Sequence, residues 1–317
     1  MISWRYHVVS IVAVIIAFGL GILAGTSVVG DRFARDLQLN YDEAIAERDA
    51  AHEVVGLQQR FADALRPTIR NGVLAGEEAV VVSVEGIDGP AQVTVDELTA
   101  AGVDVLATLT MDRRLTDAPN DDTIAAIEEI LGVTGSDPDS LDARIADALA
   151  VRLAVGPEGG KPGGADLLGG LLAAGLVTAD RDLDEDALLG IGGTGQLVVV
   201  AAGGRSLPDL VDPETLLVPF IERLVQLGAP TSAVGPSDDP YRFIRSLREA
   251  PGIPDCAMVT VDDIDMEAIG GITLSMGIDR LLDDPDPVFR PGGDYGFGDD
   301  SMMVVPGADE PPESCRA

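Results

Sequence analysis

The sequence contains few of the side chains that most often carry acid–base, redox or metal chemistry. Its 317 residues include 2 histidines, 2 cysteines and 1 tryptophan, and aromatic residues make up 4% of the chain. Both histidines, His7 and His52, precede the predicted folded domain, which excludes a histidine general base or histidine-rich metal site there. Two cysteines, Cys256 and Cys315, form neither a disulfide framework nor a zinc site, and we expect no bridge between them because Cys315 lies in a predicted tail.

Positive charge is also scarce. The chain has 21 basic and 54 acidic residues, a net charge of −33, and Lys161 is its only lysine. Such a charge disfavours nucleic acid or an anionic membrane surface as a partner of the water-soluble part. We interpret the acidity mainly as a general feature of the host's proteins, since no local pattern concentrates it into a site.

One stretch, residues 8–29, has no formal charge at all. As a helix it is about 33 Å long, enough to cross a hydrocarbon core of roughly 30 Å, and it predicts a single transmembrane helix. A signal peptide cut after Gly30 is the alternative, which the long apolar run and weak basic start at Arg5 disfavour. Charges at its two ends are balanced. Residues 1–7 are too short to form a domain, so the function must lie in the C-terminal part. We predict that this part lies outside the cytoplasm.

Small residues recur at every fourth position of this helix, a pattern that lets two membrane helices approach closely. This predicted dimer face consists of Ala13, Ala17, Gly21 and Gly25. Residues 30–70 then predict a long helical stalk with a coiled-coil-like seam interrupted by polar residues. The alternative is an amphipathic helix packed on its own domain. We expect a homodimer or larger homo-oligomer.

Residues 71–290 alternate short apolar runs with helical stretches, which predicts an α/β domain with a mostly parallel sheet covered by helices on both faces. Residues 291–317 are rich in glycine, proline and aspartate and predict a flexible acidic tail. The expected strands are 79–84, 103–109, 197–201, 231–234 and 257–261, and the expected helices are 91–101, 121–131, 140–155, 165–176, 213–227 and 241–249.

Several motifs suggest ligand sites but do not fit them. The glycine-rich residues 190–195 precede a strand instead of following one, which indicates a connector and not a dinucleotide loop. Residues 156–162 have the wrong spacing for a phosphate loop. The loops at 203–205 and 85–88 follow strands, where open α/β sheets can bind ligands, but every such fold has these loops. The acidic runs 262–265 and 283–286 lack the calcium-loop pattern and suit turns or helix caps better.

We therefore predict no enzyme activity and no cofactor. A weak soft-metal hypothesis comes from methionine, whose thioether suits Cu(I). The candidates are clustered in the last fifth of the chain without a repeated spacing, and two of them lie in apolar runs that suit a core. They are Met258, Met266, Met276, Met302 and Met303.

Three stretches resemble a known family. The chain opens Met-Ile-Ser-Trp-Arg-Tyr-His-Val-Val-Ser and runs into an apolar segment that ends at residues 19–25 with Gly-Leu-Gly-Ile-Leu-Ala-Gly. Near the other end stand Val-Asp-Asp-Ile-Asp at 261–265, Gly-Ile-Thr-Leu at 271–274 and Gly-Gly-Asp-Tyr-Gly at 292–296. These segments, and the order anchor, long helix, α/β domain and glycine-rich end, resemble the actinobacterial MctB-like family of copper-transport outer-membrane proteins.

The resemblance implies a role in copper homeostasis at the cell envelope, with copper efflux as the implied process and a copper ion as an implied partner. A self-sufficient barrel channel needs tilted, alternating strands of about ten residues. This sequence has one apolar helix and short apolar strands instead, so we do not expect such a channel. The alternative is a non-enzymatic envelope scaffold or interaction protein without a copper role.

Overall fold

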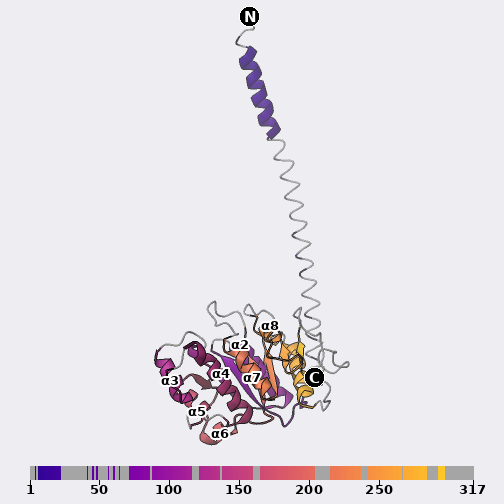
Figure 1. The fold of residues 1–317 in the computed structure, drawn as a ribbon. Coiled ribbons are helices and arrows are strands. Elements are labelled where there is room, and N and C mark those ends of the chain that lie inside the picture. Colours follow the sequence, from indigo (N-terminus) through magenta and orange to yellow (C-terminus); the bar gives the residue numbers. More distant parts are fainter. Residues whose placement is uncertain are drawn as a thin grey trace. The chain divides into compact units, whose positions relative to one another are not determined.

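A computed structural model describes residues 6–22 and most of the chain from 71 to 296, with isolated positions elsewhere (Figure 1). The chain divides into two compact units, Met1–Phe61 and Ala62–Ala317. The described residues are 4, 6–22, 41, 45, 48, 56, 60, 64, 71–85, 88–115, 121–135, 138–159, 165–203, 215–236, 242–265, 267–283 and 292–296.

In the first unit, residues 6–22 form one continuous helix whose large apolar side chains are exposed, including Ile15 at 64% and Phe18 at 70%. Among the described residues, no helix combines the length and the apolar character that a membrane crossing requires. Residues 23–29 of the predicted span, with Gly25 of the dimer face, lie outside the described residues. The described positions between 41 and 64 are helical, while the residues of the predicted coiled-coil seam lie outside the description.

The second unit is built on a sheet of order β3-β2-β1-β4-β5-β6-β7. All described neighbours pair in parallel except β2 and β3, which are antiparallel. The central strands are continuously apolar because both faces are covered. This confirms the predicted mostly parallel sheet. The strands are β1 Glu78–Val84, β2 Asp104–Met111, β3 Val177–Ala179, β4 Leu197–Ala201, β5 Thr231–Val234, β6 Val259–Val261 and β7 Gly293–Tyr295.

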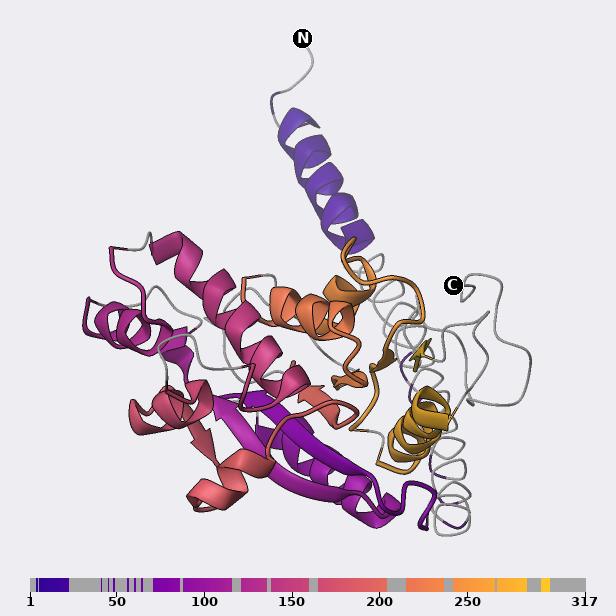
Figure 2. The same ribbon diagram turned by 60° about the horizontal axis from the view of Figure 1, so that its bottom comes forward.

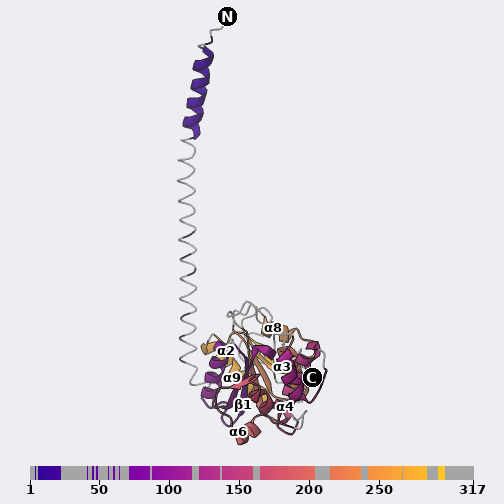
Figure 3. The same ribbon diagram turned by 90° about the vertical axis from the view of Figure 1, so that its left-hand side faces the viewer.

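Helices cover both faces of the sheet, as predicted. Figure 3 shows α2 and α9 on one side of the sheet and α3 and α4 on the other. One face carries α3 Asp121–Leu131, α4 Pro138–Val155, α5 Leu167–Ala173, α7 Leu217–Gln226 and α8 Phe243–Arg248; the other carries α2 Asp88–Ala101 and α9 Glu267–Asp283. The 3-10 turn η1 Arg113–Leu115 follows β2, and α6 Glu185–Gly190 precedes β4.

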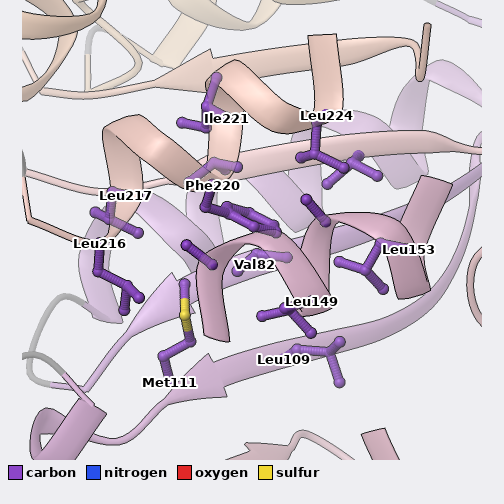
Figure 4. Packing of buried hydrophobic residues seen from close by; sticks show 14 of the residues in the cluster. Val82, Leu109, Met111, Leu149, Leu153, Leu216, Leu217, Phe220, Ile221 and Leu224 are labelled. Atoms are coloured by element: carbon purple, nitrogen blue, oxygen red, sulfur yellow. The ribbon is translucent and has the colours of Figure 1, made fainter. Parts of the chain in front are cut away.

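The core on the α4 side is almost entirely aliphatic. Helices α4 and α7 lie side by side over the sheet (Figure 2). Phe220 of α7 is 1% exposed and lies above Val82 of β1, close to Leu149 and Leu153 of α4 (Figure 4). Each such side chain contributes roughly 1.5–3 kcal/mol when it is fully buried. A complete core is thus compatible with the low aromatic content.

Four elements were not predicted: β3, α6, α9 and β7. Strand β7 lies within the segment 291–317 that we predicted to be a flexible tail, so that prediction is wrong for residues 293–295. Helix α9 and strand β7 were not predicted because they contain glycine, which has a low propensity for helices and strands. Here the glycines allow close packing: a Cβ on Gly277 of α9 would lie 2.9 Å from Val259 of β6.

Candidate functional site

A group of buried and half-buried polar side chains lies at the carboxyl ends of β5, β6 and β7. Two of the stretches that carry the family resemblance, 261–265 and 292–296, meet there. The amide of Asp262 donates to the carbonyl of Tyr295 (3.3 Å), and the amide of Ile264 donates to the carbonyl of Gly235 (3.1 Å). In an α/β sheet this edge is where ligands bind.

Arg248, the last residue of α8, connects the strands at this edge. Its side chain is 5% exposed. It donates to the Thr260 hydroxyl (2.9 Å), to the Asp262 carboxylate (2.9 Å) and to the carbonyl of Tyr295 (3.0 Å). The Thr260 hydroxyl in turn donates to Asp294 (2.8 Å). Arg248 was not identified from the sequence, because only the fold brings the end of α8 close to Asp294 and Tyr295, 46 and 47 residues further along the chain.

Steric constraints explain why glycine occupies positions 292 and 296. Gly292 donates its amide to the carbonyl of Cys256 (2.9 Å), and a Cβ there would collide with the carbonyls of Cys256 and Met258. Gly296 has a φ of +138° and lies against the carboxylate of Asp262, where any side chain would clash. These glycines therefore allow segment 292–296 to pack closely against β6 and the residues that Arg248 contacts.

Asp263, beside this network, is buried without compensation. It is 1% exposed, and neither carboxylate oxygen has a hydrogen-bond partner in the described structure. Burial, reinforced by the charges of Asp262 and Asp265, raises the pKa of Asp263 to about 6, while Arg248 opposes the shift. Nothing in the sequence distinguishes Asp263 from its acidic neighbours, since the difference is one of burial.

A small cavity of about 20 Å³ lies between α8, β6 and β7, lined by Arg248, Cys256, Met258 and Asp294 among others. It has room for a water molecule, and the guanidinium in its wall disfavours a cation. Cys256 is disulfide-bonded. The sequence holds one other cysteine, Cys315, outside the described residues. Our expectation of no bridge is therefore wrong for Cys256.

The methionine candidates do not converge in the described structure. Met258 is buried in the core cluster that includes α8, whereas Met276 is half-buried on α9, on the opposite face of the sheet. Met266, Met302 and Met303 lie outside the described residues. Within the described ranges, no group of three or more histidine, cysteine or acidic residues is placed to hold a metal ion. The soft-metal hypothesis stays a prediction for the residues beyond them.

The glycine-rich segment 190–195 precedes β4 and packs on α4. Gly192 has a φ of +80°, and a Cβ there would lie 2.6 Å from the carbonyl oxygen of Arg152. Arg152 is fully buried; it pairs with Asp166 (2.5 Å) and donates to the carbonyls of Ile191 and Leu188. The segment joins α6 to β4, and its contacts with α4 give it a packing role that the prediction of a flexible connector did not include.

The two predicted loops at the carboxyl ends of strands are only partly described. Glu85 is exposed and lies 3.5 Å from the amide of Arg113, a weak contact. Asp88 begins α2 and Gly203 follows β4, whereas Gly86, Gly204 and Arg205 lie outside the described residues. In the acidic run 283–286, Asp283 ends α9 and the rest is outside as well.

Comparison with known proteins covers both units of the chain. A family model described as copper transport outer membrane protein, MctB, matches residues 1–306. Proteins named copper transporter MctB from Mycobacterium tuberculosis and Mycobacterium bovis are 25% identical over 332 residues, which cover 96% of this chain and 99% of theirs. The match includes the apolar N-terminal segment and the segments that meet around Arg248. The chain belongs to the MctB family of copper transport outer membrane proteins.

Proposed function

We propose that this protein is a membrane-anchored component of copper transport at the cell envelope, acting in copper efflux, with its α/β unit outside the cytoplasm. The observation that carries the proposal is the extent of the family match, residues 1–306, which includes the apolar helix and the α/β unit together. The relatives that match over nearly their full length are named copper transporters.

Two features support the anchoring and the side of the membrane. Exposed large apolar side chains are concentrated on the helix 6–22, whereas the second unit exposes only Val155 and Leu189 among its described residues. An uncharged surface of this kind suits lipid better than water. The disulfide at Cys256 supports a compartment outside the cytoplasm, where such bonds persist.

We propose a non-enzymatic role in a homo-oligomer. The buried arginines Arg152 and Arg248 are both held in packing networks, which suits a protein that organises a transport assembly. A scaffold without a copper role is the competing function.

Copper measurements on a strain that lacks the gene separate the two functions. The deletion should raise cellular copper and sensitivity to copper salts, and the full-length gene should restore both. Unchanged copper content and sensitivity would favour the scaffold. As a control, the strain should respond normally to zinc, because a general envelope defect would raise sensitivity to both metals.

The anchor is tested by placing charges on it. The double variant Ile15→Arg and Ile16→Arg should move the protein from the membrane fraction to the soluble fraction, because each arginine costs about 2.5–3.5 kcal/mol at a helix centre. The matched control, Val155→Arg with Leu189→Arg, adds the same charges at exposed positions of the second unit and should leave the protein in the membrane. Equal behaviour of the two variants would contradict the anchor.

The dimer face is tested with a pair of glycines. Gly21 belongs to the predicted face, and Gly19 lies two positions away, on the far side of a helix. Neither has an atom within 4 Å of an added Cβ. Gly21→Cys should therefore give disulfide-linked dimers on mild oxidation, and Gly19→Cys should not. Equal cross-linking at both positions would contradict a specific face.

A further inference from the structure

The junction between β6 and α9, residues 261–270, holds the carboxylate of Asp263 inside the protein. On one side the amide of Ile264 is bonded to the carbonyl of Gly235 (3.1 Å). On the other, a Cβ on Gly270 of α9 would lie 2.5 Å from the Asp263 carbonyl oxygen and 2.8 Å from the Ile264 Cα. These contacts fix the backbone of residues 263 and 264 against Gly235 and α9, and both carboxylate oxygens of Asp263 are buried.

The charges around Asp263 do not compensate for this burial. Asp262 and Asp265 face it with like charge, and Arg248 is the opposing cation. Arg248 is already bonded to Asp262 (2.9 Å), to Thr260 and to Tyr295. Among the described residues, an ionised Asp263 therefore has neither a hydrogen-bond donor nor a dedicated counter-charge, a state that proteins rarely maintain.

We propose that Asp263 makes the β6–α9 junction proton-sensitive: with a proton bound it stays between β6 and α9, and on losing the proton it moves towards water and loosens the first turns of α9. The geometry carries the proposal, and the raised pKa of about 6 places the change in a mildly acidic range. The proposal is independent of copper and of the membrane anchor.

The loosening is confined to one side of the site. The Arg248 network ties Asp262 to β7 and does not involve Asp263, so the pairing of β6 with β7 persists. Further along α9, Gly271 packs against the side chain of the buried Glu97 on α2. The part expected to respond to protons is therefore Asp263 and the start of α9 up to Gly271, at the edge of the sheet where α/β proteins present ligand-binding loops.

Hydrogen exchange of the full-length protein in detergent tests this directly. Exchange is compared near pH 5 and near pH 7, after correction for the intrinsic rate, in peptides from residues 263–275 and from α4 as an internal reference. If Asp263 has its ordinary pKa once the junction opens, opening should increase about tenfold over this range. The α4 peptide should change far less.

Two substitutions assign the effect. Asp263→Asn keeps the shape and removes the titration, so its exchange in 263–275 should be independent of pH. Asp265→Asn, the matched control at an exposed position, should retain a change close to that of the wild type. The proposal is overturned if wild-type exchange is flat, if Asp263→Asn keeps the pH dependence, or if α4 responds as strongly as 263–275.

Discussion

Two buried arginines, Arg152 and Arg248, organise opposite ends of the α/β unit in different ways. Arg152 is fully buried and meets one carboxylate, Asp166, and the backbone carbonyls of Leu188 and Ile191. Arg248 meets the carboxylate of Asp262 and lies 3.6 Å from that of Asp294. One cation faces one anion at the first centre, whereas several carboxylates surround the second.

This difference in charge balance suggests different roles: the site at Arg152 stabilises packing, whereas the site at Arg248 can respond to a change in pH. At Arg152 the charges balance, and Asp166 also caps α5 by accepting the amide of Gly169 (2.9 Å). At Arg248 negative charge is in excess, and next to it Asp263 has no partner in the described structure. Uncompensated buried charge reduces stability, and perturbed groups of this kind are concentrated at functional sites.

The largest effect should come from Arg152→Met. The change leaves the carbonyls of Leu188 and Ile191 without this donor, and leaves Asp166, whose side chain is 23% exposed, with the amide of Gly169. Removing one partner of a buried pair costs about 3–5 kcal/mol. We expect a loss of about 4 kcal/mol in the free energy of unfolding. Urea unfolding of the full-length protein, followed by circular dichroism, measures it. A loss below about 1 kcal/mol would contradict the packing role.

Arg248→Met should be less destabilising, with a loss of about 3 kcal/mol, because it leaves one backbone carbonyl, that of Tyr295, without this donor instead of two. The side chains of Asp262 and Asp294 are 16% and 31% exposed and can be hydrated. Arg245→Met on the same helix is the control: its pair with Glu249 is exposed at both ends and contributes about 0.3–0.5 kcal/mol. If both substitutions cost the same, Arg248 does not connect the strands as described.

A glycine packs closely against the backbone near each arginine site, so the two sites can also be compared by glycine substitution. Gly192→Ala beside Arg152 and Gly270→Ala beside Asp263 each place a methyl group against backbone atoms, at 2.6 Å and 2.5 Å respectively. Each should cost about 2–3 kcal/mol through overpacking. Gly190→Ala, with no atom within 4 Å of its Cβ, should change stability by less than about 0.5 kcal/mol. The same unfolding measurement distinguishes them.

The sheet could be predicted from the sequence because its central strands are short, β-branched and buried on both faces. Residues 197–201 and 231–234 were predicted with the bounds that the structure has. Such runs need no knowledge of their neighbours. Strand β7, Gly-Asp-Tyr, has no apolar pattern, and its pairing depends on β6 and on the space that Gly292 leaves free, which only the assembled fold reveals.

The candidate site was visible in the sequence as two motifs without a connection. The run 262–265 was assigned to turns and caps, and 292–296 to a resemblance, while Arg248 drew no attention. Charge alone cannot distinguish the roles of Asp262, Asp263 and Asp265. Asp262 pairs with Arg248, the carboxylate of Asp263 has no donor among the described residues, and Asp265 is exposed. Burial and partner geometry decide a carboxylate's role, and both arise from tertiary contacts.

Asp263→Asn should change stability in the opposite direction from the other substitutions. The folded-state pKa of about 6 lies above the ordinary 3.8, so the stability of the wild type is highest below 3.8 and falls as pH rises towards 6. The neutral amide avoids that loss. We expect the variant to be about 3 kcal/mol more stable than wild type near pH 7 and about half as much near pH 5.

Unfolding at the two pH values measures this difference, and Asp166→Asn is the control, because it removes a charge that Arg152 requires and should lower stability at both. A gain for Asp263→Asn that is equal at both pH values would mean that the carboxylate is already ionised inside the protein at pH 5, so that its folded-state pKa is not raised. A loss near pH 7 would mean that the charged form has a partner, and the second arginine centre would then be as balanced as the first.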